Sequence, residues 1–224
     1  DGCELWVARV LPNGSLGDAQ RVAGGSQESI FQPEWSPGGV LHFISDRTGW
    51  WNLYRFREGT VEPLCAMPAE FGLPQWVFGQ STYAFESAER IVCSYVDQSA
   101  WHLATLNTMT LELQAFALPY TDIARVRAAP CRAYFLAGSP TEAQQLVQLD
   151  LATGRYESLR CSSAVTVDSG YISVPQAIEF ATESGQTAHG FYYPPRNRDY
   201  IAPRGELPPL IVESHGGPTG STGD

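Results

Sequence analysis

Four strand-like segments recur three times along the chain, up to Leu159. Each segment is a short run of alternating or continuous apolar residues, and turn-forming Pro, Asn and Gly separate the runs. Leu53, Leu103 and Leu146 mark the third segment of successive repeats, at intervals of about 40–50 residues. Four strands in a repeat of this length are typical of β-propeller blades.

The predicted strands of the three repeats can be located directly in the sequence. They are 33–36, 40–44, 52–55 and 61–64, then 74–77, 90–95, 102–106 and 113–116, then 123–126, 133–136, 145–150 and 156–159. Two earlier segments, 4–9 and 20–23, fit the last two strands of a preceding blade. The alternative is an ordinary β-sandwich built from hairpins. The propeller is favoured because the order of four strands recurs, and not only their spacing.

A single blade has two apolar faces and cannot cover both, so blades stack around an axis. Propellers close with about 4–8 blades, and about three and a half are visible here. The chain begins with Asp1 rather than with Met. We therefore expect further blades to precede it, and we assign residues 1–165 to an incomplete ring of blades.

The charged residues exclude several classes of function. All 14 basic residues are Arg and none is Lys, against 24 acidic residues, for a net charge of −10. A chain without Lys has no P-loop lysine for phosphate and no Schiff-base lysine. Its acidity argues against nucleic acid as a partner, because phosphate binding needs a basic face. No apolar run reaches the roughly 20 residues of a membrane helix, so a membrane is not expected as a partner either.

Cysteine and histidine are scattered in a way that predicts neither a metal site nor a redox site. There are five Cys and four His, and no two Cys have C-x-x-C spacing. We therefore expect no metal and no cofactor. An odd number of dispersed Cys favours free thiols over disulfides, as in a reducing compartment, and we expect a cytoplasmic protein.

The sequence changes character after about residue 165. Segments 176–182 and 187–193 suggest a hairpin, and a stretch rich in Pro and Arg follows. The apolar run 210–213 then leads into Ser-His-Gly-Gly-Pro. A short, continuous apolar strand that ends in a glycine turn is typical of a strand buried in an α/β sheet. The predicted fold is therefore mainly β, with propeller blades followed by the first strands of a second, α/β domain over residues 171–224.

Four motifs together resemble the prolyl oligopeptidase family of serine peptidases (family S9), and most closely its acylaminoacyl-peptidase-like branch. They are Trp-Ser-Pro-Gly-Gly at 35–39, Ser-Asp-Arg-Thr-Gly-Trp-Trp-Asn-Leu-Tyr at 45–54, Glu-Phe-Gly-Leu-Pro-Gln-Trp at 70–76, and the segment 210–218. The blade motifs are generic, but their ordered combination with His-Gly-Gly-Pro is specific. The resemblance covers essentially the whole chain.

This resemblance implies a propeller that caps an α/β-hydrolase domain and filters access to a Ser-Asp-His triad. Substrates would be short peptides or N-acylated peptides. In the hydrolase fold a loop after a buried strand supplies an oxyanion-hole N–H, so Gly217, with Gly216 beside it, would donate to the oxyanion. His215 and Pro218 would belong to the same loop, with His215 structural rather than catalytic. The sequence contains no G-x-S-x-G nucleophile elbow, so we expect no triad residue in this chain and no activity from it alone.

Several residues of the blade loops have both a functional and a structural interpretation. Trp50 and Trp51 could line a substrate channel, although aromatic residues at a blade turn are more often packed between blades. Glu70 could recognise a substrate amine. Asp46 and Arg47 could bind a substrate terminus, but a local ion pair that stabilises the turn is favoured.

Two other functions stay open from the sequence. The chain could belong to a non-catalytic propeller that binds a partner, because it has blades and no nucleophile. It could also belong to an α/β-hydrolase esterase, although esterases often carry His-Gly-Gly-Gly, and Pro218 in place of the third Gly favours a peptidase.

Overall fold

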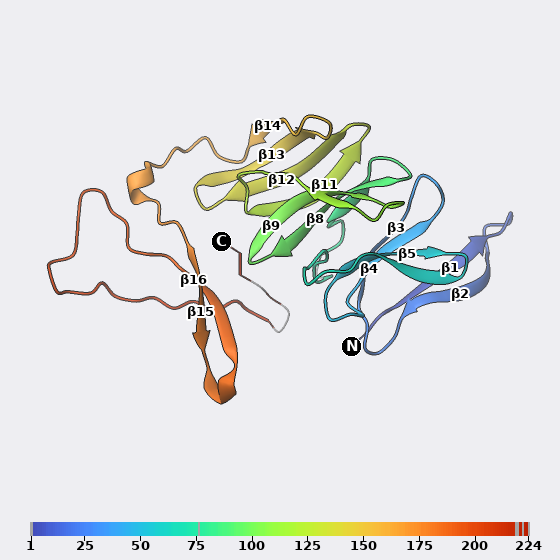
Figure 1. Ribbon diagram of the computed structural model, residues 1–224, viewed down its shortest axis with the longest axis horizontal. Coiled ribbons are helices and arrows are strands. Elements are labelled where there is room, and N and C mark those ends of the chain that lie inside the picture. Colours follow the sequence, from blue (N-terminus) through green and yellow to red (C-terminus); the bar gives the residue numbers. More distant parts are fainter. Residues whose placement is uncertain (1, 76, 218–219, 221, 224) are drawn as a thin grey trace.

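The computed structural model describes residues 2–75, 77–217, 220 and 222–223. Within these residues the strands form antiparallel sheets that follow one another in chain order (Figure 1). The strands of the blade region are β1 (Glu4–Val10), β2 (Leu16–Gly24), β3 (Ile30–Trp35), β4 (Leu41–Ser45), β5 (Asn52–Arg57), β6 (Thr60–Cys65), β7 (Tyr83–Phe85), β8 (Arg90–Asp97), β9 (Ala100–Asn107), β10 (Leu113–Ala115), β11 (Asp122–Ala129), β12 (Arg132–Ser139), β13 (Glu142–Asp150) and β14 (Tyr156–Cys161).

Three consecutive four-stranded sheets have the arrangement of propeller blades, as the repeat predicts. Their strand orders are β3-β4-β5-β6, β7-β8-β9-β10 and β11-β12-β13-β14, and β1 and β2 form a two-stranded sheet before them. All five residues of β4 are buried. A strand is buried on both faces only when its sheet lies between two neighbours, and this explains the continuous apolar runs in the sequence.

The first strand of the second blade begins at Tyr83, later in the chain than the repeat predicts. Residues 74–77 were predicted to form this strand, but the blade begins with Tyr83–Phe85, which pairs with β8. Pro74 has no N–H to donate to a ladder, whereas Tyr83 is almost completely buried and its neighbours continue the pairing to Ile91. The chain before β7 is instead a long connection between the first two blades.

Apolar clusters fill the seams between successive sheets. The seam between the first and second blades contains Phe31, Ile44 and Leu53 from one side and Ile91 and Leu106 from the other. A second cluster joins the second and third blades, and a smaller one joins β1–β2 to the first blade. The blades therefore stabilise one another face to face, as expected for stacked repeats.

Bulges in the first strands of two blades also contribute to the seams. Gln32 in β3 and Arg125 in β11 have left-handed backbones, with φ of 46° and 56°, and each lies at a register shift. The Gln32 amide accepts a hydrogen bond from the Thr82 N–H (2.8 Å) and donates one to the Tyr83 carbonyl (2.7 Å). The side chain of the bulged residue thus joins the first blade to the second.

His42 is buried in the seam between the first and second blades, at 2% exposure. Its Nδ1 lies 3.0 Å from the Val40 carbonyl, and its Nε2 is buried without a hydrogen-bond partner. Its ring meets Phe85 of the second blade edge-on, with 4.9 Å between centroids. Its cross-strand neighbours are Glu34 and Arg55. Burial lowers the pKa of His42, and the charge of Arg55 lowers it further.

Protonation of His42 is expected to destabilise this seam as the pH falls. The unfolded chain takes up a proton near pH 6.5, whereas folded His42 resists it because its pKa is lowered. Stability is therefore full above about pH 6.5 and decreases below it, by up to about 1.4 kcal/mol per pH unit. Urea unfolding between pH 8 and 5 should show this slope, and His42→Gln should flatten it. His189→Gln, at an exposed position, should keep it. A wild-type slope in His42→Gln would contradict the prediction.

The chain after β14 forms a separate hairpin and an extended segment (Figure 1). Its elements are the 3₁₀ turn η1 (Ser169–Tyr171), β15 (Gln176–Ala181), η2 (Glu183–Gly185) and β16 (Thr187–Tyr192), and β15 pairs with β16. The predicted strand 210–213 is not formed, and these residues are exposed. A buried strand needs hydrogen-bonded neighbours, and none of the described strands pairs with this segment.

A hollow of about 540 Å³ beside η1 is lined partly by Arg196 and Arg198. Both guanidinium groups already have protein partners. Arg198 forms an ion pair with Asp168 and lies 5.4 Å from the Tyr171 ring, and Arg196 donates to the Ser169 carbonyl over 3.0 Å. These contacts hold the Pro- and Arg-rich stretch against η1. Within the described residues, no helix has the length and hydropathy of a membrane span.

Candidate functional site

One end of the blades carries the connections that the sequence analysis singled out. Because strands alternate in direction, the connections β4–β5, β6–β7, β8–β9, β10–β11 and β12–β13 all lie at this end, where β14 also ends. We call it the exit face, because the chain leaves the blades here. In Figure 1 its β8–β9 and β12–β13 turns lie on the side of the hairpin β15–β16.

Two of the predicted channel residues, Trp51 and Glu70, meet at the exit face. The Trp51 N–H donates to Glu70 Oε2 over 2.8 Å, and the Phe71 N–H donates to the Trp51 carbonyl over 2.7 Å. The Trp51 ring packs edge-on against Phe31, with 6.0 Å between centroids. It also lies so close to Gly72 that a Cβ there would clash with it. The Glu70 carboxylate therefore fixes the turn that carries Trp51.

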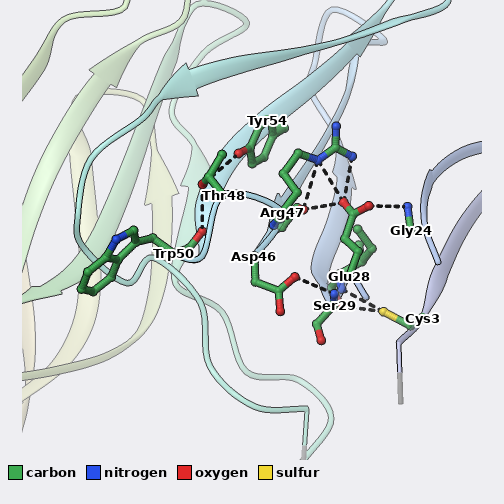
Figure 2. A network of polar contacts seen from close by, with 11 residues as sticks. Cys3, Gly24, Glu28, Ser29, Asp46, Arg47, Thr48, Trp50 and Tyr54 are labelled. Atoms are coloured by element: carbon green, nitrogen blue, oxygen red, sulfur yellow. Dashed lines mark hydrogen bonds and ion pairs between the residues drawn. The ribbon is translucent and has the colours of Figure 1, made fainter. Parts of the chain in front are cut away.

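Trp50, the third predicted channel residue, points away from this packing. Its side chain is 43% exposed, and its carbonyl accepts a long hydrogen bond (3.5 Å) from the Thr48 hydroxyl. Figure 2 shows the indole apart from the polar network of the same turn. Trp50 is thus available for contact with another molecule or domain, whereas Trp51 is committed to the core.

Arg47 of the same turn binds Glu28 and not its sequence neighbour, so the predicted Asp46–Arg47 ion pair is wrong (Figure 2). Its Nε and a terminal nitrogen lie 3.0 and 2.8 Å from Glu28 Oε1. Asp46 instead accepts a hydrogen bond from the Ser29 N–H over 2.7 Å. The local interpretation failed because the partner is supplied by a loop nineteen residues earlier in the sequence.

The environment of Glu28 keeps its carboxylate ionised. Burial by itself raises the pKa of Glu28, but hydrogen bonds from Ser45 (2.5 Å) and Arg47 outweigh this effect, and the net pKa lies below its usual range. The Gly24 N–H donates to the second carboxylate oxygen over 3.0 Å. The Arg47 guanidinium also lies 5.0 Å from the Tyr54 ring, a cation–π contact. Glu28 and Arg47 bind each other and neighbouring groups of the chain, so the role of this ion pair is structural.

The predicted oxyanion loop lies in the exposed C-terminal segment. His215 and Gly216 are exposed, and Gly217 has a left-handed backbone with φ of 73°, which favours glycine. Pro218, predicted in the same loop, lies outside the described residues. Among the described residues, His215, Gly216 and Gly217 form no hydrogen bond with Trp50, Trp51 or Glu70. No group of His, Cys, Asp and Glu in the described chain is arranged to hold a metal ion.

Arg125, midway along β11, is a residue that the sequence did not mark as functional. It is exposed, and its guanidinium makes a long contact (3.5 Å) with the Gly79 carbonyl in the β6–β7 connection. A signal was present, because Ile123 and Val126 are both apolar and both buried although they are three residues apart. A regular strand alternates with a period of two. The break in this alternation marks the β-bulge that leaves the Arg125 side chain exposed to solvent.

The comparisons with known proteins give structural relatives for almost the whole chain. No protein-family model and no curated protein matches it. A crystal structure of puromycin hydrolase matches 93% of the chain with 36% identity and a TM-score of 0.85. A puromycin-hydrolyzing peptidase of Mycobacterium tuberculosis matches 93% with 32% identity and a TM-score of 0.87. Prolyl oligopeptidase B from Galerina marginata matches 84% with 12% identity and a TM-score of 0.64, which shows the fold alone.

The match covers only part of each relative. The chain spans 32% of both puromycin-hydrolysing proteins and 26% of the Galerina marginata protein. The blades and the segment after them therefore correspond to about a third of a larger relative. The structural relatives of this chain are puromycin hydrolases and prolyl oligopeptidases, and the resemblance to the prolyl oligopeptidase (S9) family predicted from the sequence is confirmed.

Proposed function

We propose that this chain is part of a serine peptidase, with propeller blades over residues 1–165 and the start of an α/β-hydrolase domain over residues 171–224. The observation that carries the proposal is the match to puromycin hydrolase, at 36% identity over 93% of the chain. A serine-to-alanine mutant of that enzyme was crystallised in complex with PGG, which supports a peptide as the ligand. We assign short peptides or N-acylated peptides as substrates, as in the acylaminoacyl-peptidase-like branch, and a cytoplasmic location.

The proposed chemistry is acyl transfer through a serine supplied by the rest of the protein. The serine Oγ attacks the scissile carbonyl while a histidine takes its proton, and the C–N bond then breaks as that proton passes to the leaving amine. Water then attacks the acyl-enzyme while the histidine takes its proton, and that proton passes to the serine Oγ as the ester bond breaks. The Gly217 N–H, with Gly216 beside it, donates to the oxyanion. The left-handed backbone of Gly217 supports this role, because a residue without a Cβ adopts it easily and lets a substrate carbonyl approach closely.

Access to this site is assigned to the exit face of the blades. Trp50 is exposed there and can contact a substrate, while Trp51 and Glu70 hold its turn in place. The propeller thereby filters substrates by size. His215 and Pro218 shape the oxyanion loop and take no part in proton transfer.

A fluorophosphonate probe, which reacts with activated serines, tests the proposal. The protein expressed from its complete reading frame should be labelled at a single serine in a G-x-S-x-G motif, and the 224-residue chain alone should not be labelled. Absence of labelling on the complete protein would favour a non-catalytic propeller. Faster turnover of a simple ester than of an acyl-peptide would favour an esterase.

A further inference from the structure

Two blades of the described chain have a β-bulge with a left-handed residue in their first strand, which is the inner edge of the blade. Gln32 in β3 and Arg125 in β11 both lie at bulges, and both have left-handed φ values that are unfavourable for residues other than Gly, Asn and Asp. β3 and β11 are each the first strand of a blade, and β11 packs beside β7 of the neighbouring blade. First strands with this arrangement line the axis around which blades stack.

The structure explains the strain at Gln32 through its side chain. The Gln32 amide bonds the Thr82 N–H and the Tyr83 carbonyl, and the Gln32 carbonyl accepts a hydrogen bond from the Tyr83 hydroxyl over 2.8 Å. These bonds tie the first blade to the second at buried positions. The cost of a left-handed residue is offset by the contacts that it gains.

The strain at Arg125 has no such explanation. In that seam the blade contact is made by its neighbour, because the Val126 N–H donates to the Ser81 carbonyl over 2.9 Å and the Ser81 hydroxyl donates to the Val126 carbonyl over 2.5 Å. Among the described residues, the Arg125 side chain has one hydrogen bond, the long 3.5 Å contact with the Gly79 carbonyl. Across the described residues, no carboxylate lies within ion-pair distance of its guanidinium, although the chain has 24 acidic residues.

The position of Arg125 makes this free charge useful for ligand binding. It lies midway along β11, the first strand of its blade, and its guanidinium reaches the β6–β7 connection of the exit face, which contains Phe78 and Gly79. Phe78 is 99% exposed, so the approach to Arg125 also offers an apolar contact. A guanidinium presents a planar fork of N–H donors that matches a carboxylate in two parallel hydrogen bonds.

We propose that Arg125 binds a carboxylate of the peptide substrate and so determines specificity. This inference rests on the proposed function of the exit face as the route of peptide access. The carboxylate comes either from the C-terminus of a short peptide or from an acidic side chain. In both cases the protein prefers the ionised ligand over its uncharged amide.

Steady-state kinetics of the complete protein test this preference directly. The substrates are one peptide with a free C-terminus, the same peptide amidated, and an Asp/Asn pair of amidated peptides. Arg125→Asn removes the charge with a residue that accepts a left-handed backbone, so the fold is preserved. The ratio of kcat/KM for carboxylate over amide should fall by about tenfold to a hundredfold, as for the loss of one charge-assisted hydrogen bond.

Arg132→Asn is the matched control, because it removes the same charge from the same blade at the start of β12, beside the end of β11 that lies away from the exit face. It should keep the wild-type ratio. Loss of preference in the C-terminal pair assigns Arg125 to the peptide terminus, and loss in the Asp/Asn pair assigns it to an acidic side chain. An unchanged ratio in both pairs for Arg125→Asn would overturn the inference.

Calorimetry separates this inference from the proposed peptidase activity. If the complete protein hydrolyses no peptide, the carboxylate and amide forms are titrated into it directly. Tighter binding of the carboxylate that is lost in Arg125→Asn supports the inference while the peptidase proposal fails. Equal affinity of the wild-type protein for both forms overturns the inference.

Discussion

Replacing Phe71 with alanine is expected to lower the free energy of unfolding by about 3–5 kcal/mol. Phe71 is fully buried (0% exposed) although it lies in a connection and not in a strand. Its ring stacks on Tyr95 of the second blade, with 5.1 Å between centroids, and its N–H binds the Trp51 carbonyl of the first. The truncation therefore opens a cavity at a seam that both blades share, where the backbone cannot easily collapse.

Phe78 provides the matched control for this prediction, because the same change removes the same atoms from the same connection. Its side chain is 99% exposed, and Phe78→Ala should change the free energy of unfolding by no more than about 0.5 kcal/mol. Urea unfolding of the two variants, followed by tryptophan fluorescence, gives both values. A loss below about 1 kcal/mol in Phe71→Ala would show that the connection is not an anchor of the seam.

The blades were predictable because strand pairing and burial repeat along the sequence. Leu53 and Leu103 occupy the same place in successive blades, and both are completely buried. The repeat and the apolar runs have one physical cause, because each sheet is covered on both faces by its neighbours. Almost every strand was therefore placed to within a few residues.

The contacts between distant residues were not predictable from the same pattern. Arg47 looked like the partner of Asp46, but the partner of an ion pair is chosen in three dimensions, and the loop that carries Glu28 lies closer to its guanidinium. Tyr83 begins the second blade because its ring fits the seam, although the Pro74 segment has the stronger local likeness to the other repeats. The bulge at Arg125 shows only as a break in the period.

The two parts of the candidate site, the Trp51–Glu70 contact and segment 210–213, differ in whether the described chain supplies their hydrogen-bond partners. Trp51 and Glu70 belong to two separate motifs of the sequence, nineteen residues apart, and the fold joins them through the hydrogen bond from the Trp51 N–H to the Glu70 carboxylate. A strand at 210–213 depends on partner strands that the described chain does not provide. The strands β15 and β16 form because each supplies the other's hydrogen bonds, whereas segment 210–213 pairs with no described strand.

Replacing Glu28 with alanine is expected to cost about 2–4 kcal/mol of unfolding free energy. One carboxylate joins three parts of the chain, because it accepts hydrogen bonds from Ser45 and Arg47 of the first blade and from the Gly24 N–H at the end of β2 (Figure 2). Ser45 is completely buried, so its hydroxyl would lose its acceptor without gaining water. The Arg47 guanidinium would lose its ion pair as well.

Glu4→Ala is the control, because it breaks an exposed ion pair of similar length, 3.0 Å from Arg21. Exposed pairs contribute little, so this change should leave the free energy of unfolding almost unchanged. Similar losses in the two variants would contradict a special role for Glu28. Thermal unfolding monitored by circular dichroism is sufficient for this comparison, with urea titration to convert midpoints to free energies.

The pH dependence of stability, compared between the wild-type protein and Glu28→Gln, tests whether the charge of Glu28 causes the effect. Glutamate in the unfolded chain titrates near 4.5, and the net pKa of folded Glu28 lies below that value. The contribution of its ionised form is therefore complete above about pH 4.5 and is lost as the pH falls through the folded pKa. The difference in stability between the wild-type protein and Glu28→Gln should shrink over this range. A difference that stays constant down to pH 3 would mean that Glu28 acts through its shape and not through its charge.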